Sequence, residues 1–116
     1  MNYVLIAYDH SDDEAFNRRN ACRAEHIANV THLEEEGKII YAMAMLDGDK
    51  IVGSIVSFEV ESEDEVTAYV AKDPYTHNQV WDPKRIEIKA CLIPEMFKPT
   101  RNPKWIASST KAYKAY

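Results

Sequence analysis

The chain has 116 residues, a formal net charge of −5 and a hydrophobic fraction of 46%. This length accommodates one domain with a real core but leaves little room for a separate cofactor-binding domain. No segment approaches the roughly 20 apolar residues of a membrane span, and no basic leader or cleavage site is evident. Cys22 and Cys91 lie inside predicted elements, which is typical of free thiols, with a single disulfide as the alternative. We therefore expect a cytoplasmic domain with no membrane partner.

The first half of the chain predicts a strand, a helix and a hairpin. Residues 3–8 are rich in β-forming side chains and predict a strand. A helical pattern follows over residues 16–36 and ends at Gly37, a natural left-handed terminator. Two further strands, over residues 38–46 and 51–60, are joined by an Asp-Gly turn that is typical of a hairpin.

The second half predicts one more helix and one more strand. Ser62 and Glu65 form a capping box that opens a helix reaching about residue 72, and Pro74 disfavours its continuation. An alternating stretch over residues 85–93 predicts the fourth strand. The order strand-helix-strand-strand-helix-strand is that of the ferredoxin-like α+β fold, in which an antiparallel sheet carries both helices on one face.

The uncovered face of this sheet predicts self-association. Both faces of the strand over residues 51–60 carry apolar side chains. Pairing of two sheets through the open face would bury it and can close a barrel. We therefore expect a homodimer or a higher homo-oligomer.

The last residues differ in charge from the rest of the chain. Residues 94–116 carry five lysine or arginine residues against one acidic residue, whereas residues 1–93 are acidic. We divide the chain into a ferredoxin-like domain over residues 1–93 and a basic C-terminal extension over residues 94–116. The extension is expected to pack on its own domain or on a neighbouring subunit, with binding of an anionic partner as the alternative.

A histidine lies on the apolar face of the first predicted helix. His26 shares this face with Cys22, Val30 and Leu33, at spacings of three or four residues. Asp73 continues the corresponding face of the second helix, which is formed by Val66, Tyr69 and Val70. A carboxylate beside an imidazole fixes its tautomer and raises its basicity. The two faces predict a proton-transferring pair; the alternative is that His26 caps a polar pocket while Asp73 only terminates its helix.

Short motifs along the chain point to a known family. They are Arg23-x-x-His26-Ile27, Glu36-Gly37-Lys38-Ile39, Gly53-Ser54, Ser62-x-x-Glu65 and Asp73-Pro74-Tyr75. Their order within one strand-helix-strand-strand-helix-strand frame, over about residues 1–93, resembles the YCII-related family of small dimeric α+β barrel proteins. The resemblance implies that His26 and Asp73 are the catalytic pair.

Further residues are expected to bind the substrate. Arg23, three residues before His26, is suited to stabilising an enolate or phenolate oxyanion. Tyr75 or Tyr8 is expected to donate a hydrogen bond or to return a proton, and Ser54 of the Gly53-Ser54 motif joins this set. The family usually has Ala-Gly-Pro where this chain has Ala42-Met43-Ala44, so Met43 is expected to narrow or reshape the pocket.

The sequence favours an enzyme without a cofactor. It has no glycine-rich nucleotide motif and no metal-ligand spacing of histidines or cysteines, so we expect neither a cofactor nor a metal. The pI near 5.3 and the lack of stacking aromatics exclude an RNA-recognition module, so no nucleic-acid partner is expected. The expected partner is a small-molecule substrate.

The family resemblance gives this chemistry a concrete form. It implies a lyase or isomerase acting on a small oxygenated aromatic or lactone, most concretely a dehydrochlorinase of chlorinated hydroxyhydroquinones in chloroaromatic degradation. Two alternatives remain. One is a cofactor-free monooxygenase of quinol-type substrates, and the other is a non-catalytic module that binds a small ligand.

Overall fold

The structure, a computed structural model, describes residues 1–97. Its elements are β1 (Asn2–Asp9), α1 (Ala15–Glu35), β2 (Ile39–Asp47), β3 (Lys50–Glu59), α2 (Glu63–Lys72), α3 (Pro74–His77), β4 (Trp81–Cys91) and the 3-10 helix η1 (Glu95–Phe97). Most of the predicted basic extension, from residue 98 onward, lies outside the described residues. In the described part of the chain, no helix has the length and apolar character that crossing a membrane requires.

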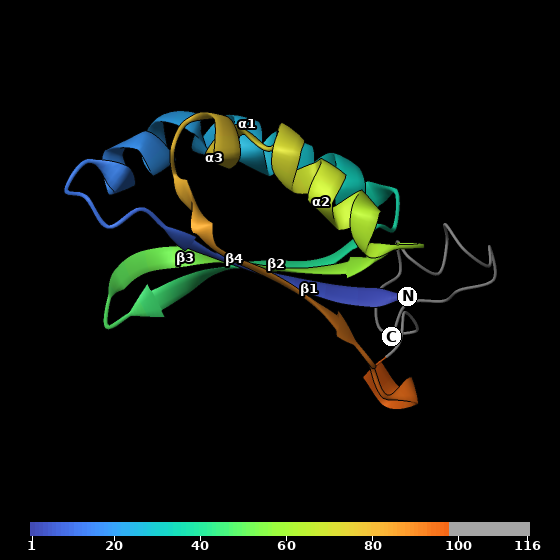
Figure 1. Ribbon diagram of the computed structural model, residues 1–116. Helices are drawn as coiled ribbons and strands as arrows, with labels where there is room; N and C mark the ends of the chain where they lie inside the picture. The colour runs from blue at the N-terminus through green and yellow to red at the C-terminus, as the bar shows by residue number, and fades with distance from the viewer. Residues whose placement is uncertain (98–116) are drawn as a thin grey trace.

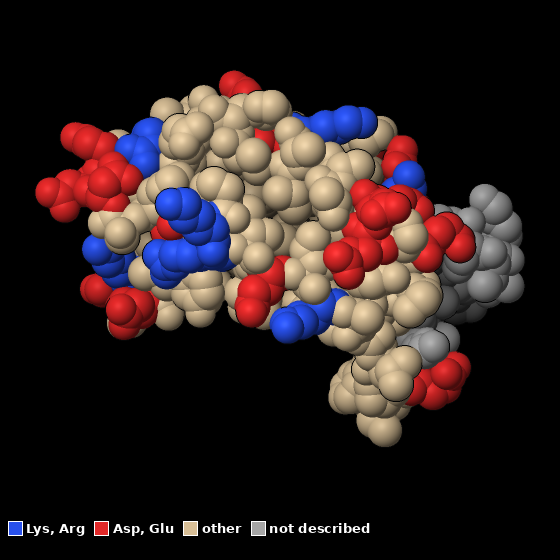
Figure 2. Space-filling view, in the orientation of Figure 1, with Lys and Arg blue, Asp and Glu red and all other residues tan. Residues whose placement is uncertain are grey.

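The four strands form one antiparallel sheet in the order β2-β3-β1-β4, and the helices cover one of its faces (Figure 1). This arrangement confirms the predicted ferredoxin-like α+β fold. Figure 2 shows acidic side chains gathered near the start of α2, whose first turn contains Glu63, Asp64 and Glu65. Negative charge at a helix N-terminus is favourable because the helix dipole is positive there.

Two details after α2 differ from the sequence-based expectation. Pro74 ends α2 but also begins the short helix α3, because proline is tolerated in the first turn of a helix and the Asp73 side chain caps that turn. The strand β4 begins at Trp81 rather than at residue 85 and includes Pro83. A proline is tolerated there because β4 is an edge strand of the sheet.

The core lies between the sheet and the helices. Alternate residues of β1, namely Tyr3, Leu5 and Ala7, face the helices and are buried together with their β3 partners Phe58, Val56 and Ser54. The intervening side chains face the other side of the sheet, where Val4, Ile6 and Ile55 are only partly buried. The strand period of two therefore decides which side chains of the sheet reach the space below the helices.

Candidate active site

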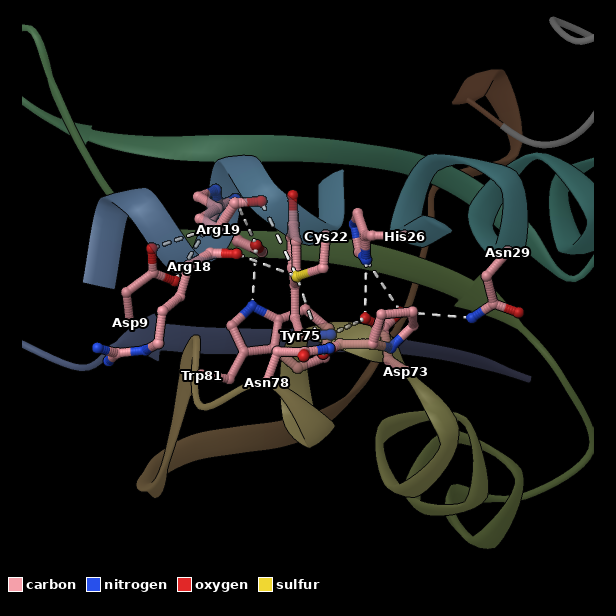
Figure 3. Close-up of polar contacts among 12 residues, drawn as sticks. Asp9, Arg18, Arg19, Cys22, His26, Asn29, Asp73, Tyr75, Asn78 and Trp81 are labelled. Carbon is pink, nitrogen blue, oxygen red and sulfur yellow. Dashed lines mark hydrogen bonds and ion pairs between the residues drawn. The ribbon is translucent and has the colours of Figure 1, made fainter. Parts of the chain in front are cut away.

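His26 and Asp73, the pair that the sequence predicted from two separate helix faces, are in direct contact in the structure. His26 lies in the middle of α1, and Asp73 lies between α2 and α3 (Figure 3). The His26 Nδ1 atom is 2.8 Å from one carboxylate oxygen of Asp73 and 3.0 Å from the other. An ionised carboxylate only accepts hydrogen bonds, so Nδ1 carries the hydrogen and Nε2 is left as the basic nitrogen. Within residues 1–97, no hydrogen bond involves the Nε2 atom of His26.

The Asp73 carboxylate is completely buried and is satisfied by three donors. Besides His26, the Tyr75 backbone N–H donates at 2.8 Å, and the Asn29 side-chain amide donates at 3.3 Å. Burial acts to raise the pKa of Asp73, but the hydrogen bond and charge of His26, with smaller contributions from Tyr69 and Tyr75, lower it below its ordinary value. The carboxylate is therefore held in its ionised form.

The lowered pKa of Asp73 predicts how stability depends on pH. An aspartate in the unfolded chain has a pKa of about 3.9, which is above the pKa of Asp73 in the folded state. The stabilisation by Asp73 is therefore fully present above about pH 4, and it is lost as the pH falls toward and through the folded-state pKa. Urea unfolding between about pH 2.5 and 6 is expected to show this loss in the wild type and not in Asp73→Asn. Equal pH slopes for the two proteins would contradict the assignment.

Tyr75 lies between two cationic or basic side chains. Its ring stacks on the His26 imidazole with centroids 3.8 Å apart and an interplanar angle of 11°. The Arg19 guanidinium carbon is 4.7 Å from the centre of the same ring, and Figure 3 shows Arg19 and His26 on opposite sides of Tyr75. Both ring faces are therefore occupied by the protein. Burial raises the pKa of the Tyr75 hydroxyl, against the opposing effect of Arg19, so this hydroxyl is a proton-bearing donor.

Arg19 is the main site residue that the sequence analysis missed. It is buried, and its Nη1 atom donates to both oxygens of Asp9 at 2.8 Å. Its Nη2 atom donates to the Ser54 hydroxyl at 2.9 Å and to the Gly53 carbonyl at 3.3 Å. The signal for it was present, because Arg19 precedes Cys22 by three residues and His26 by seven and so lies on the same helix face.

A cavity of about 230 Å³ connects these groups. It is lined by Arg19, Asn20, Arg23, His26, Ile27, Val30, Ala42, Met43, Ala44, Ile51, Ser54, Val56 and Tyr75. Of the predicted site residues, the structure thus brings together Arg23, His26, Met43, Ser54 and Tyr75 around one space, with Asp73 directly behind His26. Met43 borders the cavity from β2, but it pairs with Ile55, so its side chain lies on the helix-free sheet face and does not narrow the cavity as expected. Arg23 is solvent-exposed at the α1 side.

Tyr8 lies elsewhere. It occupies a β1 position that pairs with Gly53 on the sheet face away from the helices, and the Arg85 guanidinium lies 4.7 Å from its ring centre. The alternation of side chains along β1 explains this position, because Ala7 and Asp9, its two neighbours, are the residues that face the helices. Tyr8 is therefore not part of the cavity lining.

The cysteines take no part in the contacts of the pair. Cys22 and Cys91 are not bonded to each other, and burial raises the pKa of the Cys22 thiol. The Cys22 Sγ atom donates to the Arg18 carbonyl, one turn earlier in α1, at 3.3 Å. Cys22 therefore behaves as a small buried core residue. Within residues 1–97, no group of three or more histidine, cysteine or acidic side chains is arranged to hold a metal ion.

A second cavity, of about 250 Å³, lies between α1 and α2. Its lining includes Asn29, whose amide donates to Asp73, and Tyr69, but it does not include His26. We place the candidate site in the first cavity, because its lining combines the imidazole with the buried arginine and the Ser54 hydroxyl.

Comparisons with known proteins agree with this architecture. Among solved structures, a 5-chloro-2-hydroxyhydroquinone dehydrochlorinase from Burkholderia phenoliruptrix, in complex with 2,5-dihydroxybenzoquinone, is similar with a TM-score of 0.69 and 22% identity, over 83% of this chain and 98% of that one. A NIPSNAP family protein from Agrobacterium tumefaciens has a TM-score of 0.49 and 16% identity, over 81% of this chain and 93% of that one. No curated protein matches the sequence. The model of the YCII-related domain matches residues 1–88, and the chain therefore belongs to the YCII-related domain family.

Proposed function

We propose that this chain is a cofactor-independent acid–base enzyme that eliminates HCl from a chlorinated hydroxyhydroquinone. The observation that carries the proposal is the 2.8 Å contact between His26 Nδ1 and the buried Asp73 carboxylate, at the wall of a cavity. The likeness in fold to a dehydrochlorinase supports the choice of reaction.

The pair supplies a base at a fixed position. Asp73 holds Nδ1, so Nε2 accepts a proton from a ring hydroxyl of the substrate. General base catalysis of this kind is typically worth about 10²- to 10⁴-fold in rate. Arg23, exposed beside the cavity, attracts the anionic form of the substrate and stabilises the oxyanion that develops.

The elimination balances without an oxidant or a metal. His26 takes the proton of the hydroxyl next to the chlorinated carbon, and that carbon receives a proton as the hydroxyl becomes a ketone. The hydroxyl para to the first then loses its proton, and chloride leaves with the electron pair of the C–Cl bond. A chlorotrihydroxybenzene thereby becomes a hydroxybenzoquinone and HCl.

The direct test measures chloride release and oxygen uptake with chlorinated and unchlorinated hydroxyhydroquinones. We expect chloride release from the chlorinated compounds at equal rates with and without oxygen, after subtraction of spontaneous oxidation in an enzyme-free control. Enzyme-dependent oxygen uptake would replace the proposal with a monooxygenase. Saturable binding without turnover of any compound would replace it with a non-catalytic binding module.

We also propose that two copies of the chain pair through the helix-free sheet face. Val4, Ile6 and Ile55 form an apolar strip on this face and are only partly buried in one copy. Covering such a strip is favourable by about 25 cal/mol per Å² of apolar surface. Light scattering is expected to give twice the 13.3 kDa mass of the chain, and a monomeric mass at micromolar concentration would contradict the pairing.

A further inference from the structure

The Ser54 hydroxyl lies between two hydrogen-bond donors of the protein. Its Oγ atom accepts a hydrogen bond from Arg19 Nη2 at 2.9 Å and another from Trp81 Nε1 at 3.0 Å. The guanidinium and the indole N–H are donors that cannot accept. A hydroxyl has two lone pairs and one hydrogen, so both lone pairs of Ser54 are in use. The hydrogen must point in a third direction.

No acceptor within the described residues takes this hydrogen. Ser54 is 3% exposed, so bulk water does not explain its environment, and its side chain borders the cavity that contains His26. Leaving a buried donor unpaired costs about 1–3 kcal/mol, so such a donor in a cavity wall is typically matched by a ligand or an ordered water. The free hydrogen of Ser54 is therefore available to the contents of the cavity.

We propose that Ser54 donates a hydrogen bond to a carbonyl or phenolate oxygen of the ligand and so selects ring compounds that carry negative charge on that oxygen. The inference rests on the proposed function only for the reaction that follows binding. The hydrogen bond from Ser54 to the ligand does not depend on that reaction. It assigns Ser54 as the specificity-determining donor of the cavity, with Trp81 as the residue that orients it.

Arg19 strengthens this donor without touching the ligand through its terminal nitrogens. Its Nη1 atom is committed to Asp9, and its Nη2 atom to Gly53 and Ser54. A hydrogen bond received from a cation polarises the hydroxyl and makes it a better donor in turn. The buried arginine thus acts on the contents of the cavity through the polarised hydroxyl of Ser54.

The Ser54 donor and the His26 base line the same cavity. Tyr75 separates Arg19, which holds Ser54, from His26 in the view of Figure 3. A ring compound in this cavity has both the basic Nε2 of His26 and the Ser54 hydroxyl in the surrounding wall. One ring oxygen is then deprotonated while another accepts the hydrogen bond.

The test uses 4-nitrocatechol, whose phenolate absorbs at a longer wavelength than its neutral form. The wild type is expected to bind it saturably and to lower its apparent pKa, since a hydrogen bond to a charged oxygen favours the ionised form. Ser54→Ala is expected to weaken binding of the phenolate by about 10- to 100-fold, which corresponds to the loss of one hydrogen bond to a charged group. Ser57→Ala, on the same strand but on the helix-free face, is the matched control and should bind as the wild type does.

A second variant separates binding from folding. Ser54→Ala leaves the buried donors of Arg19 and Trp81 without their acceptor, and urea unfolding measures that effect. Trp81→Phe keeps the Ser54 hydroxyl but frees one lone pair, so the hydroxyl can turn. It is expected to weaken phenolate binding less than Ser54→Ala does. The double variant removes one of the orphaned donors but also loses buried volume, and it should bind the phenolate no better than Ser54→Ala does.

The outcomes are distinct for the two proposals. Phenolate binding that is unchanged in a folded Ser54→Ala or double variant would overturn the role of Ser54, as would the lack of saturable binding by the wild type. Weakened phenolate binding in Ser54→Ala, together with no chloride release by the wild type, would support Ser54 as the donor to the ligand and reject the elimination reaction.

Discussion

His26→Ala is expected to lower kcat for chloride release by about 10²- to 10⁴-fold, the usual contribution of a general base. The loss should fall mainly on kcat, because the imidazole acts on the substrate proton during the reaction, while Ser54, Arg23 and the apolar wall continue to bind the ring. The measurement is the initial rate of chloride release at saturating substrate.

His32→Ala provides a matched control on the same helix. His32 is exposed, pairs with Glu36 at 3.1 Å and does not line the cavity. Its replacement should leave kcat within about twofold of the wild type, as is usual for surface substitutions away from special features. A kcat for His26→Ala as high as that of His32→Ala would remove His26 from the mechanism. Urea unfolding of both variants ensures that folded proteins are compared.

Asp73→Ala is expected to have the largest effect on stability of any change at the site. It removes the acceptor of three donors at a fully buried position, including the backbone N–H at the start of α3. Breaking a buried network by deleting one partner costs about 3 kcal/mol. Urea unfolding at pH 7 should show this decrease in the free energy of unfolding, and chloride release should fall at least as far as in His26→Ala.

Asp73→Asn separates the charge of Asp73 from its shape. The amide oxygen still accepts from Tyr75 and His26, so the loss of stability should be smaller than in Asp73→Ala. The charge that stabilises a protonated imidazole is lost, however, and kcat is expected to fall by about 10²-fold or more. A stable Asp73→Asn variant with wild-type kcat would show that Asp73 only caps α3.

Much of the fold followed from local patterns in the sequence. The Ser62-x-x-Glu65 pattern, the terminator Gly37 and the Asp-Gly hairpin each predicted an element close to its observed bounds. The predicted capping box itself is not formed, because the Ser62 side chain makes no capping hydrogen bond. The short helix α3 was missed because a proline after a helix signals an end more strongly than a new beginning. The early start of β4 was missed because the edge position that tolerates Pro83 is a property of the whole sheet.

The candidate site was only partly predictable because its contacts join distant elements. The helix period placed His26 and Asp73 on inward faces, but only the packing of α1 against α3 brings them within 2.8 Å. Arg19 was missed since a lone arginine in a helix is usually a solvated side chain, and its partner Asp9 is the last residue of a strand. Tyr8 was assigned to the site by its residue type, whereas its place in the strand alternation directs it to the other face.

One wall of the cavity stands apart from the proposed proton-transferring pair. Residues 42–44 border it from β2, an edge strand, and no side-chain hydrogen bond of the described residues joins them to His26, Asp73, Arg19 or Ser54. Residues that hold the base are tied to the core, so changes there cost stability. Changes at Ala42 and Ala44, whose β3 partners Val56 and Ser54 face the helices, reshape the space for a ligand without that cost. Divergence of substrate range among duplicated copies, and directed evolution toward a new ring substituent, would therefore proceed most readily through this strand.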